Sequence, residues 1–183
     1  FLKQDRERAR IRFLTEHDDF VYEQCHRVLE GKTFRGMEVC QRSAFSRRCA
    51  RCDNGEPTTW QFYAWVYVST HDYPERPARG EVTPTKVGKR SVFREEVNEA
   101  RLMELSTFHA DSIALRAEEL ETLLGHDFDW VRMGKPGEPK TTYLLEVVGP
   151  AKLTKELREL AAGLPDLEDV VLGRAKTDDG EDK

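Results

Sequence analysis

The chain has 183 residues, 38% of them hydrophobic and 34% charged, which is enough for one domain with a hydrophobic core and typical of a soluble, rather polar protein. No apolar run approaches the roughly 20 residues that a membrane-spanning helix needs. The charged opening FLKQDRERARIRFL is unlike a secretory signal. We therefore expect a cytoplasmic protein without membrane contact.

Charge is distributed unevenly along the chain, so the formal net charge of −5 says little about any one region. Residues 20–52 carry seven Lys or Arg and three Glu, a net charge of +4. Residues 150–183 carry six basic and nine acidic residues, a net charge of −3. Because the local field decides what each region attracts, a positive patch and an acidic C-terminal region are both expected.

The first half of the chain is predicted to be mainly β. Alternating side chains over 9–14 and the β-branched and aromatic residues of 20–29 predict two strands. Residues 30–58, rich in Gly, Arg and Cys, are too irregular to form a core without a stabilising cross-link. Residues 60–69 (WQFYAWVYVS) give the strongest strand pattern of the chain, and three prolines with two glycines predict a long loop over 74–88.

The second half mixes helix and strand. The pattern over 90–105 is compatible with a strand, a helix or both. Four apolar residues then share one helical face, and Gly125 is suited to end that helix; they are Ile113, Ala117, Leu120 and Leu124. The predicted elements are a helix over 109–124, strands over 128–133 and 141–148, and a short amphipathic helix over 153–162.

This order of elements indicates a mainly β protein with one or two helices, of the α+β class. Several short strands, with a helix before the final hairpin, favour a small barrel of five to six strands. The Cys-rich stretch would be inserted between two of them.

The cysteines predict a metal site. All four lie between positions 25 and 52, as Cys25, Cys40, Cys49 and Cys52, and His26 is next to the first. Cys49 and Cys52 form a C-x-x-C pair whose sulfurs can face one ion, and tetrahedral zinc takes four Cys or His ligands. The spacing His26-x13-Cys40-x8-Cys49-x2-Cys52 therefore predicts one zinc ion. Four protein ligands leave no open position, so this Zn²⁺ would be structural.

The fourth ligand is either His26 or Cys25, because neighbours in a strand point to opposite faces and only one can reach the ion. Ordinary buried thiols would have no reason to gather in a Gly- and Arg-rich stretch. A redox C-x-x-C is expected within a βαβ pattern, and none surrounds Cys49. Metal binding is therefore the preferred interpretation.

Five aromatic residues fall within eight positions of the chain: Trp60, Phe62, Tyr63, Trp65 and Tyr67. In a strand, the first two share one face and the other three share the opposite face. One face must pack on the core, so the other would present rings near five arginines of the Cys-rich stretch, namely Arg35, Arg42, Arg47, Arg48 and Arg51. Rings that stack on bases, beside cations that neutralise phosphates, suit single-stranded nucleic acid. The competing interpretation makes the rings core residues and the arginines a solvated surface.

Motifs of the common enzyme classes are missing from the sequence. It contains no G-x-x-x-x-G-K-[ST], H-E-x-x-H or G-x-S-x-G. The zinc deaminase signature also fails, because Ser-Arg-Arg precedes Cys49 where that motif needs Pro, and there is no His-x-Glu. We therefore expect a protein that is not an enzyme.

The stretch FVYEQCHRV, followed by VCQRSAFSRRCARCDNGEPTTWQFYAWVYV, resembles the single-stranded-DNA-binding proteins of tailed phages, including the T-even type. In that family a zinc ribbon with a His…Cys…Cys-x-x-Cys ligand set is inserted in an OB-fold. Its local hallmark is the C-x-x-C, an acidic-Gly-Pro stretch (here 52–57) and an aromatic strand. The later DFDWVRMGKPGEPKTTYLLEV is similar to the hairpin that closes the family's barrel.

The resemblance implies an OB-fold domain over 1–148 with a zinc-ribbon insert at about 25–57, a helical extension over 149–172 and an acidic tail over 173–183. It implies the zinc ligands His26, Cys40, Cys49 and Cys52, with DNA contacts from the aromatic strand and the basic residues near the ribbon. In the family, the acidic tail recruits replication and recombination proteins.

The implied function is sequence-tolerant binding of single-stranded DNA in phage replication or recombination, within an infected bacterial host. The alternative is a zinc-stabilised OB-type structural or protein-interaction module, in a phage particle or regulatory complex, without strong DNA binding.

Overall fold

The computed structural model describes residues 2–31, 33–78, 80–134 and 141–173. These residues form eight strands, five helices and two short 3-10 helices. The strands are β1 (Arg8–Phe13), β2 (Val21–Glu30), β3 (Thr33–Val39), β4 (Thr58–Tyr73), β5 (Thr83–Val87), β6 (Arg90–Ser106), β7 (His126–Met133) and β8 (Thr142–Pro150). The helices are η1 (His17–Asp19), α1 (Gln41–Phe45), α2 (Ala50–Asp53), η2 (Thr107–His109), α3 (Ala110–Leu120), α4 (Lys155–Ala162) and α5 (Leu167–Val171).

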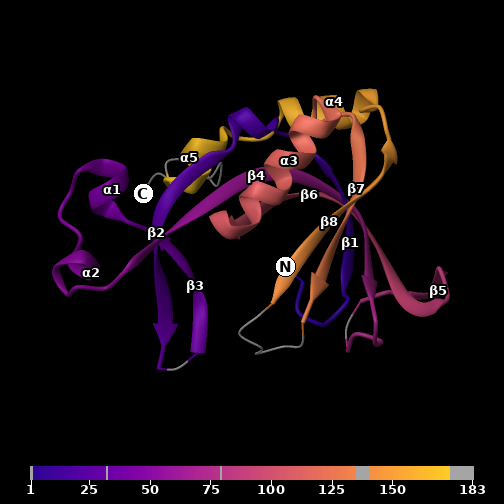
Figure 1. Cartoon of the computed structure of the whole chain (residues 1–183), viewed down its shortest axis with the longest axis horizontal. Helices are drawn as coiled ribbons and strands as arrows, with labels where there is room; N and C mark the ends of the chain where they lie inside the picture. Colours follow the sequence, from indigo (N-terminus) through magenta and orange to yellow (C-terminus); the bar gives the residue numbers. More distant parts are fainter. Residues whose placement is uncertain (1, 32, 79, 135–140, 174–183) are drawn as a thin grey trace, which may run out of the picture.

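The strands form one antiparallel sheet around the long strands β4 and β6 (Figure 1). One edge of β4 pairs with β6. The other edge pairs first with β2, from His26↔Thr58 to Val21↔Tyr63, and then with β1, from Phe13↔Val66 to Arg8↔Asp72. The sheet continues from β1 to β7 and β8, from β2 to β3, and from β6 to β5.

The sheet is not closed into a barrel, so the predicted closed barrel of five to six strands is wrong for this chain. Strand β4 has 16 residues and β6 has 17, so both run past the region where β1, β7 and β8 curve around the core. The overhanging ends carry the β2–β3 hairpin in one direction and β5 in the other (Figure 1). The outer strands therefore diverge instead of meeting.

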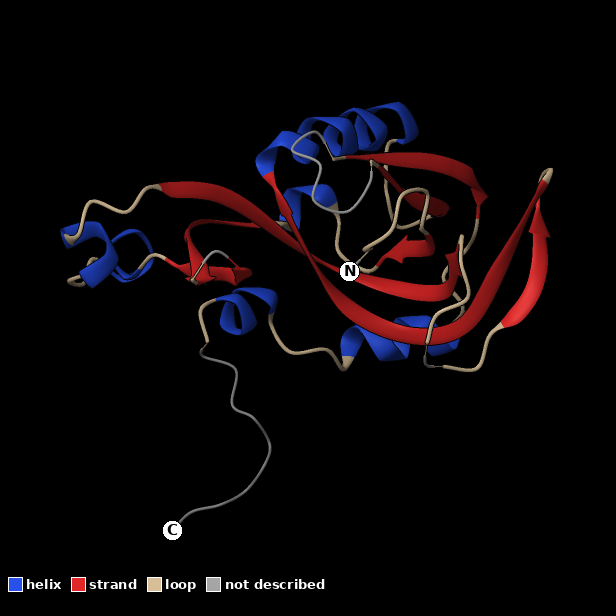
Figure 2. Ribbon diagram, turned by 90° about the horizontal axis from the view of Figure 1, so that it is seen from below, coloured by secondary structure: helices blue, strands red, loops and turns tan. Residues whose placement is uncertain are grey.

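The core lies between the curved sheet and α3. Strand β1 alternates between buried apolar residues and partly exposed arginines, as the period of a strand requires. Phe13 packs edge-on against Phe128, with ring centroids 5.5 Å apart, and Ile113 brings the apolar side of α3 into the same cluster. Figure 2 shows α3 on one side of the sheet and the two C-terminal helices on the other. Among the helices of the described chain, none combines the length and apolarity needed to cross a bilayer.

Most predicted elements are present, with corrections in the middle of the chain. The predicted loop over 74–88 contains β5, because the turn at Gly88 folds this segment back onto β6. The ambiguous stretch 90–105 is the strand β6. Helix α3 ends before Gly125, since Glu121 already adopts a left-handed conformation with φ of 64°. Of the predicted acidic tail, residues 174–183 lie outside the described residues.

Candidate metal centre

Four predicted ligands come together at the base of the β2–β3 hairpin. His26 lies within β2, and Cys40 directly follows β3. Cys49 is the N-cap of α2, and Cys52 lies within the single turn of that helix. The pairing of His26 with Glu38 and the hydrogen bond from the Cys40 amide to the Gln24 carbonyl, 2.8 Å long, place Cys40 beside β2. The compact turns of α1 and α2 then return Cys49 and Cys52 to the same point.

The ligand atoms have the spacing of a tetrahedral metal site. The Sγ atoms of Cys40 and Cys52 are 3.4 Å apart, and His26 Nε2 is 3.5 Å from Cys49 Sγ and 3.4 Å from Cys52 Sγ. All four ligand atoms lie within 4.8 Å of one another. Zinc bonds of about 2.3 Å to sulfur and about 2.0–2.1 Å to nitrogen give tetrahedron edges of about 3.6–3.8 Å. Small shifts of the ligand atoms would therefore fit the cluster around one ion.

The structure distinguishes His26 from Cys25 as the fourth ligand. Ring atom Nδ1 of His26 is 3.3 Å from the carbonyl oxygen of Pro57, an acceptor, which keeps the proton on Nδ1 and leaves the Nε2 lone pair for a metal. Cys25 points the other way, and its Sγ lies 3.2 Å from the hydroxyl of Tyr63 inside a separate apolar cluster. The buried cluster therefore contains His26 and three cysteines, without Cys25.

The surroundings shift the pKa values of the cluster thiols in opposite directions. Hydrogen bonding from the Cys52 backbone amide lowers the pKa of Cys49 to about 6. The hydrogen bond with Cys40, together with burial, raises the pKa of Cys52 to about 11. The neighbouring thiols thus oppose each other's ionisation. A divalent metal would remove this opposition, because all three thiolates would then face a positive charge and their protons would be released.

Of the five predicted arginines, four lie in the segment that carries the cysteine ligands and Arg35 lies toward the tip of the β2–β3 hairpin; most pair with carboxylates. Arg42 and Arg48 both reach Asp53, and Arg51 bridges Glu38 and Glu56. Arg35 pairs with Glu30. The guanidinium of Arg47 lies over the ring of Phe45, 5.3 Å from its centroid. None of the five lines the groove described next.

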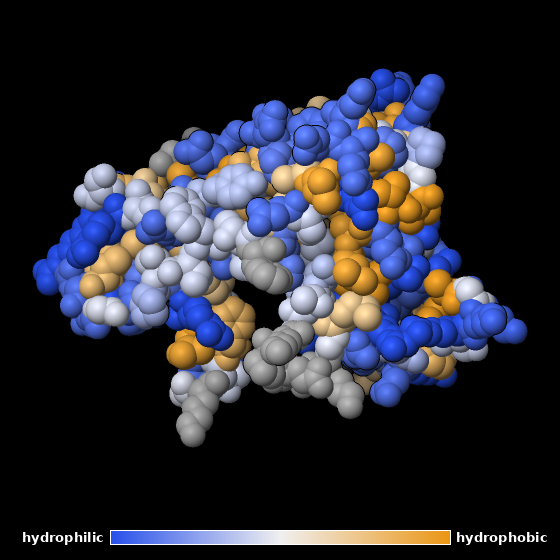
Figure 3. All heavy atoms as spheres, viewed as in Figure 1, coloured by the Kyte–Doolittle hydropathy of each residue, from blue (hydrophilic) through white to orange (hydrophobic). Residues whose placement is uncertain are grey.

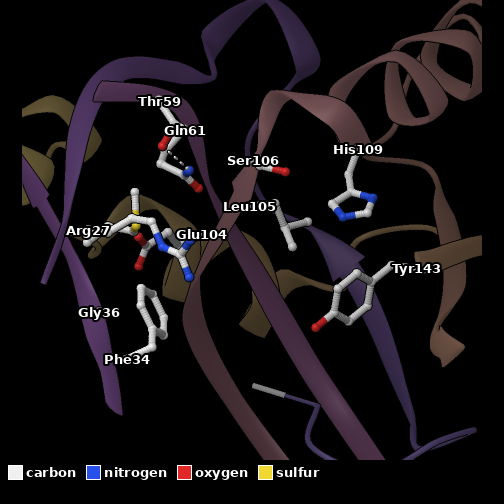
Figure 4. A pocket seen from close by; sticks show the side chains of 11 residues that line it. Arg27, Phe34, Gly36, Thr59, Gln61, Glu104, Leu105, Ser106, His109 and Tyr143 are labelled. Carbon is white, nitrogen blue, oxygen red and sulfur yellow. Dashed lines mark hydrogen bonds between the residues drawn. The ribbon is translucent and has the colours of Figure 1, made fainter. Parts of the chain in front are cut away.

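A groove of about 480 Å³ lies between the β2–β3 hairpin on one side and η2 and β8 on the other (Figures 3 and 4). On the hairpin side, the guanidinium of Arg27 lies 5.5 Å from the ring centroid of Phe34, which is 51% exposed. On the opposite side, the ring of Tyr143 stacks on that of Trp130, with centroids 5.3 Å apart. The ring of His109 contacts Tyr143 edge-on, with centroids 5.1 Å apart. The floor comes from β4 and β6, through Thr59, Gln61, Glu104, Leu105 and Ser106.

The five predicted aromatic side chains of β4 do not line this groove. Phe62 and Tyr63 are 0% and 5% exposed, so neither ring offers a face to a ligand in this structure. Trp65 donates its indole N–H to the carbonyl of Pro165, and Tyr67 donates to Asn98. Trp60 is 48% exposed but is not among the residues that line the groove.

The groove residues Arg27, Phe34, His109 and Tyr143 were not predicted as site residues. They come from four separate elements, so no sequence spacing connects them. The one sequence signal was the net positive charge of residues 20–52, which include Arg27; Phe34 lies on the facing strand β3, which was not predicted.

Comparison with protein-family models found no match, and comparison with curated proteins found none either. The resemblance to phage DNA-binding proteins therefore rests on the spacing of the cluster ligands, the strand that follows them and the later hairpin sequence. The chain is a mainly β, antiparallel-sheet protein with a buried cluster of His26, Cys40, Cys49 and Cys52 that can hold a metal ion, with the donor set of a zinc site.

Proposed function

We propose that this chain is a sequence-tolerant single-stranded-DNA-binding protein with one structural zinc, related to the DNA-binding proteins of phage replication and recombination. The observation that carries the proposal is the groove with an aromatic side chain on each wall, the exposed Phe34 on one and the partly buried Tyr143 on the other. A single strand has bases that are free to enter such a groove, whereas the paired bases of a duplex are already stacked on each other.

The chemistry of the groove suits bases better than phosphates. Aromatic rings accept the π-face of any base, which gives binding with little sequence preference. Gln61 and Ser106 on the floor can donate to and accept from base edges, and the Glu104 carboxylate can accept from the amino groups that bases carry. That carboxylate would repel a phosphate, so the backbone is expected along the rim, beside Arg27.

The metal would act on this function indirectly. The cluster ties β2 to the segment that follows β3, and the same hairpin carries Arg27 and Phe34 into the groove wall. With four protein ligands there is no open coordination position for a substrate. The ion would therefore fix the position of one wall and take no part in chemistry.

The test is a titration of fluorescent oligothymidine, followed by anisotropy, with the wild type and with the variants Phe34→Ala and Tyr143→Ala. Stacking contributes about 1–3 kcal/mol per base, so each variant should bind about 5- to 150-fold more weakly. The wild type should lose affinity as salt is raised and should prefer the single strand to the matching duplex.

Trp60→Ala is the matched control, because it removes an exposed aromatic ring outside the groove. It should bind as the wild type does. A wild type with no salt-sensitive binding would refute the function, and a large loss in Trp60→Ala with none in Phe34→Ala would place the contact elsewhere.

A second candidate function, the protein-interaction module, is favoured by a separate apolar surface. Leu115 on α3 and Leu144 and Val147 on β8 are exposed and border a groove of about 540 Å³, and the exposed Val148 follows them on β8. Clustered exposed apolar side chains often mark protein contacts. This candidate predicts a stable, metal-containing protein that does not respond to oligothymidine in the same titration.

A further inference from the structure

A second charged hollow lies at the other end of the main sheet, where the β5–β6 hairpin turns. The turn has two central residues, Gly88 and Lys89, and closes with the pair Val87↔Arg90. Gly88 has a φ of 59°, the conformation that a type II′ hairpin turn needs at its first central position and that glycine adopts without strain. The turn therefore holds Lys89 and Arg90 side by side on a defined backbone.

These two side chains border a pocket of about 210 Å³ that is lined mainly by cations. Arg6 and Arg8, from the segment that leads into and begins β1, form the facing side. Val87 and Val92 supply the apolar part of the lining, and Asp72 is its only acidic residue. Four positive side chains thus surround a space about large enough for a phosphate group.

The negative charge of Asp72 is already balanced by a residue outside the lining. Asp72 is 4% exposed and accepts two hydrogen bonds from Arg94, of 2.7 Å and 2.9 Å. Arg8 is balanced too, because it pairs with Asp129 at 2.6 Å, which it shares with Arg10, and with the more exposed Glu146 at 3.4 Å. Arg6 has only a loose, exposed pair with Asp5 at 3.7 Å, which contributes little.

Lys89 and Arg90 are the uncompensated charges of the pocket. Within the part of the chain that the structure describes, neither makes an ion pair. Both are exposed and their charged groups are therefore available to an anion. A pocket with balanced charges inside and two free cations at its mouth is suited to an anionic group that can be partly surrounded and still reached from solvent.

We infer that this pocket is a second contact for the single strand and binds a backbone phosphate. The inference rests on the proposed function. Strand β4 connects the two places: Gln61 lies on the floor of the aromatic groove and Asp72 lies in the basic pocket. At about 3.3 Å per residue, they are about 36 Å apart along the strand. A short oligonucleotide would fill the groove alone, whereas a longer one would reach both places.

The test compares wild type with the double variant Lys89→Ala/Arg90→Ala, using oligothymidines of about 4 and about 16 nucleotides, the range of site sizes of OB-type domains. Each phosphate contact on a single strand contributes about 0.7 to the slope of log K against log salt concentration. Loss of this one phosphate contact should therefore reduce that slope by about 0.7 for the longer probe. The slope for the shorter probe should stay the same.

Lys155→Ala/Arg158→Ala on α4 is the control, because it removes the same charge from exposed positions away from β5 (Figure 1). This variant should keep the wild-type slope with both probes. If the wild type binds and Lys89→Ala/Arg90→Ala keeps its slope, or if the control loses as much, the second contact is wrong and the groove is unaffected. If the wild type binds neither probe, the proposed function itself is wrong.

Discussion

Replacing Cys49 by serine should release the metal and unfold residues 40–57 while the main sheet stays folded. Helices α1 and α2 contain no buried residue, and the buried side chains of this segment are the ligands Cys40 and Cys49. The segment therefore has no apolar core of its own, and its compact turns depend on the cluster. Removing one of four ligands should leave too little binding energy to hold them.

The free energy that zinc contributes indicates whether its loss unfolds the segment alone or the whole domain. Structural zinc contributes about 10–16 kcal/mol to the folding of zinc-finger peptides. That is as large as the whole stability of an average domain, about 5–15 kcal/mol. The main core, which includes Phe13, Phe62 and Phe128, contains none of the four ligands. Loss of the metal should therefore abolish the fold of the segment and leave the thermal transition of the core.

Limited trypsin digestion with parallel measurement of bound metal is a direct assay. The segment contains Arg42, Arg47, Arg48 and Arg51, four cleavage sites within the two short helices and their connection. Wild type should carry one zinc per chain and resist cleavage there, whereas Cys49→Ser should carry none and be cut rapidly.

Cys25→Ser is the matched control, because it changes a buried cysteine one position from a ligand. Cys25 packs against Tyr63 and lies outside the cluster, so this variant should keep its metal even if it loses some stability. The reasoning fails if Cys49→Ser retains one equivalent of metal, or if Cys25→Ser loses the metal as completely.

Two further predictions concern the stability of the main sheet. Burial alone would raise the pKa of Glu7, but hydrogen bonds from His71 and two backbone amides hold it below its usual value. The ionised Glu7 carboxylate therefore stabilises the fold at neutral pH, and this stabilisation is lost as pH falls through the lowered pKa. Glu7→Gln should thus flatten the acid side of a plot of unfolding free energy, measured by urea denaturation, against pH. An unchanged plot would contradict this. Ile113→Ala should cost about 2–5 kcal/mol, because Ile113 is fully buried. Leu115→Ala, at a position 53% exposed on the same helix, should cost less than about 0.5 kcal/mol, and equal losses would argue against the assigned packing of α3.

The metal cluster was predictable because its ligands are close in sequence and their chemistry is distinctive. The choice between His26 and Cys25 was different, because both have suitable ligand atoms and adjacent positions. It is decided by β4, which places Tyr63 on the Cys25 side, and by Pro57, whose carbonyl orients the imidazole. Such long-range partners leave no trace in the local spacing.

The aromatic strand shows a limit of period-two reasoning. One face of β4 was expected to pack on the core and the other to bind nucleic acid. In the structure, Phe62 faces the main core, and Tyr63 on the opposite face is covered by Leu167 of α5. A C-terminal helix about a hundred residues away thus covers the face that was expected to be free. The open sheet has a related origin, since strand lengths, which local pattern defines poorly, decide whether its edges can meet.

The length of β4 and β6 explains both the failure of barrel closure and the separation of the two proposed contacts. A strand just long enough to close a barrel would end near the core, with no overhang to carry a hairpin. Here the start of β4 lies at the metal centre, where Thr58 pairs with His26, and its far end carries Asp72 in the basic pocket. Bases would then be held at one overhang, whose wall depends on a metal, and a phosphate at the other, whose turn depends only on Gly88. Because the sites share no residue and lie far apart along one strand, their contributions to binding should be nearly additive. The open sheet would in this way support a longer stretch of single strand than the aromatic groove could hold alone.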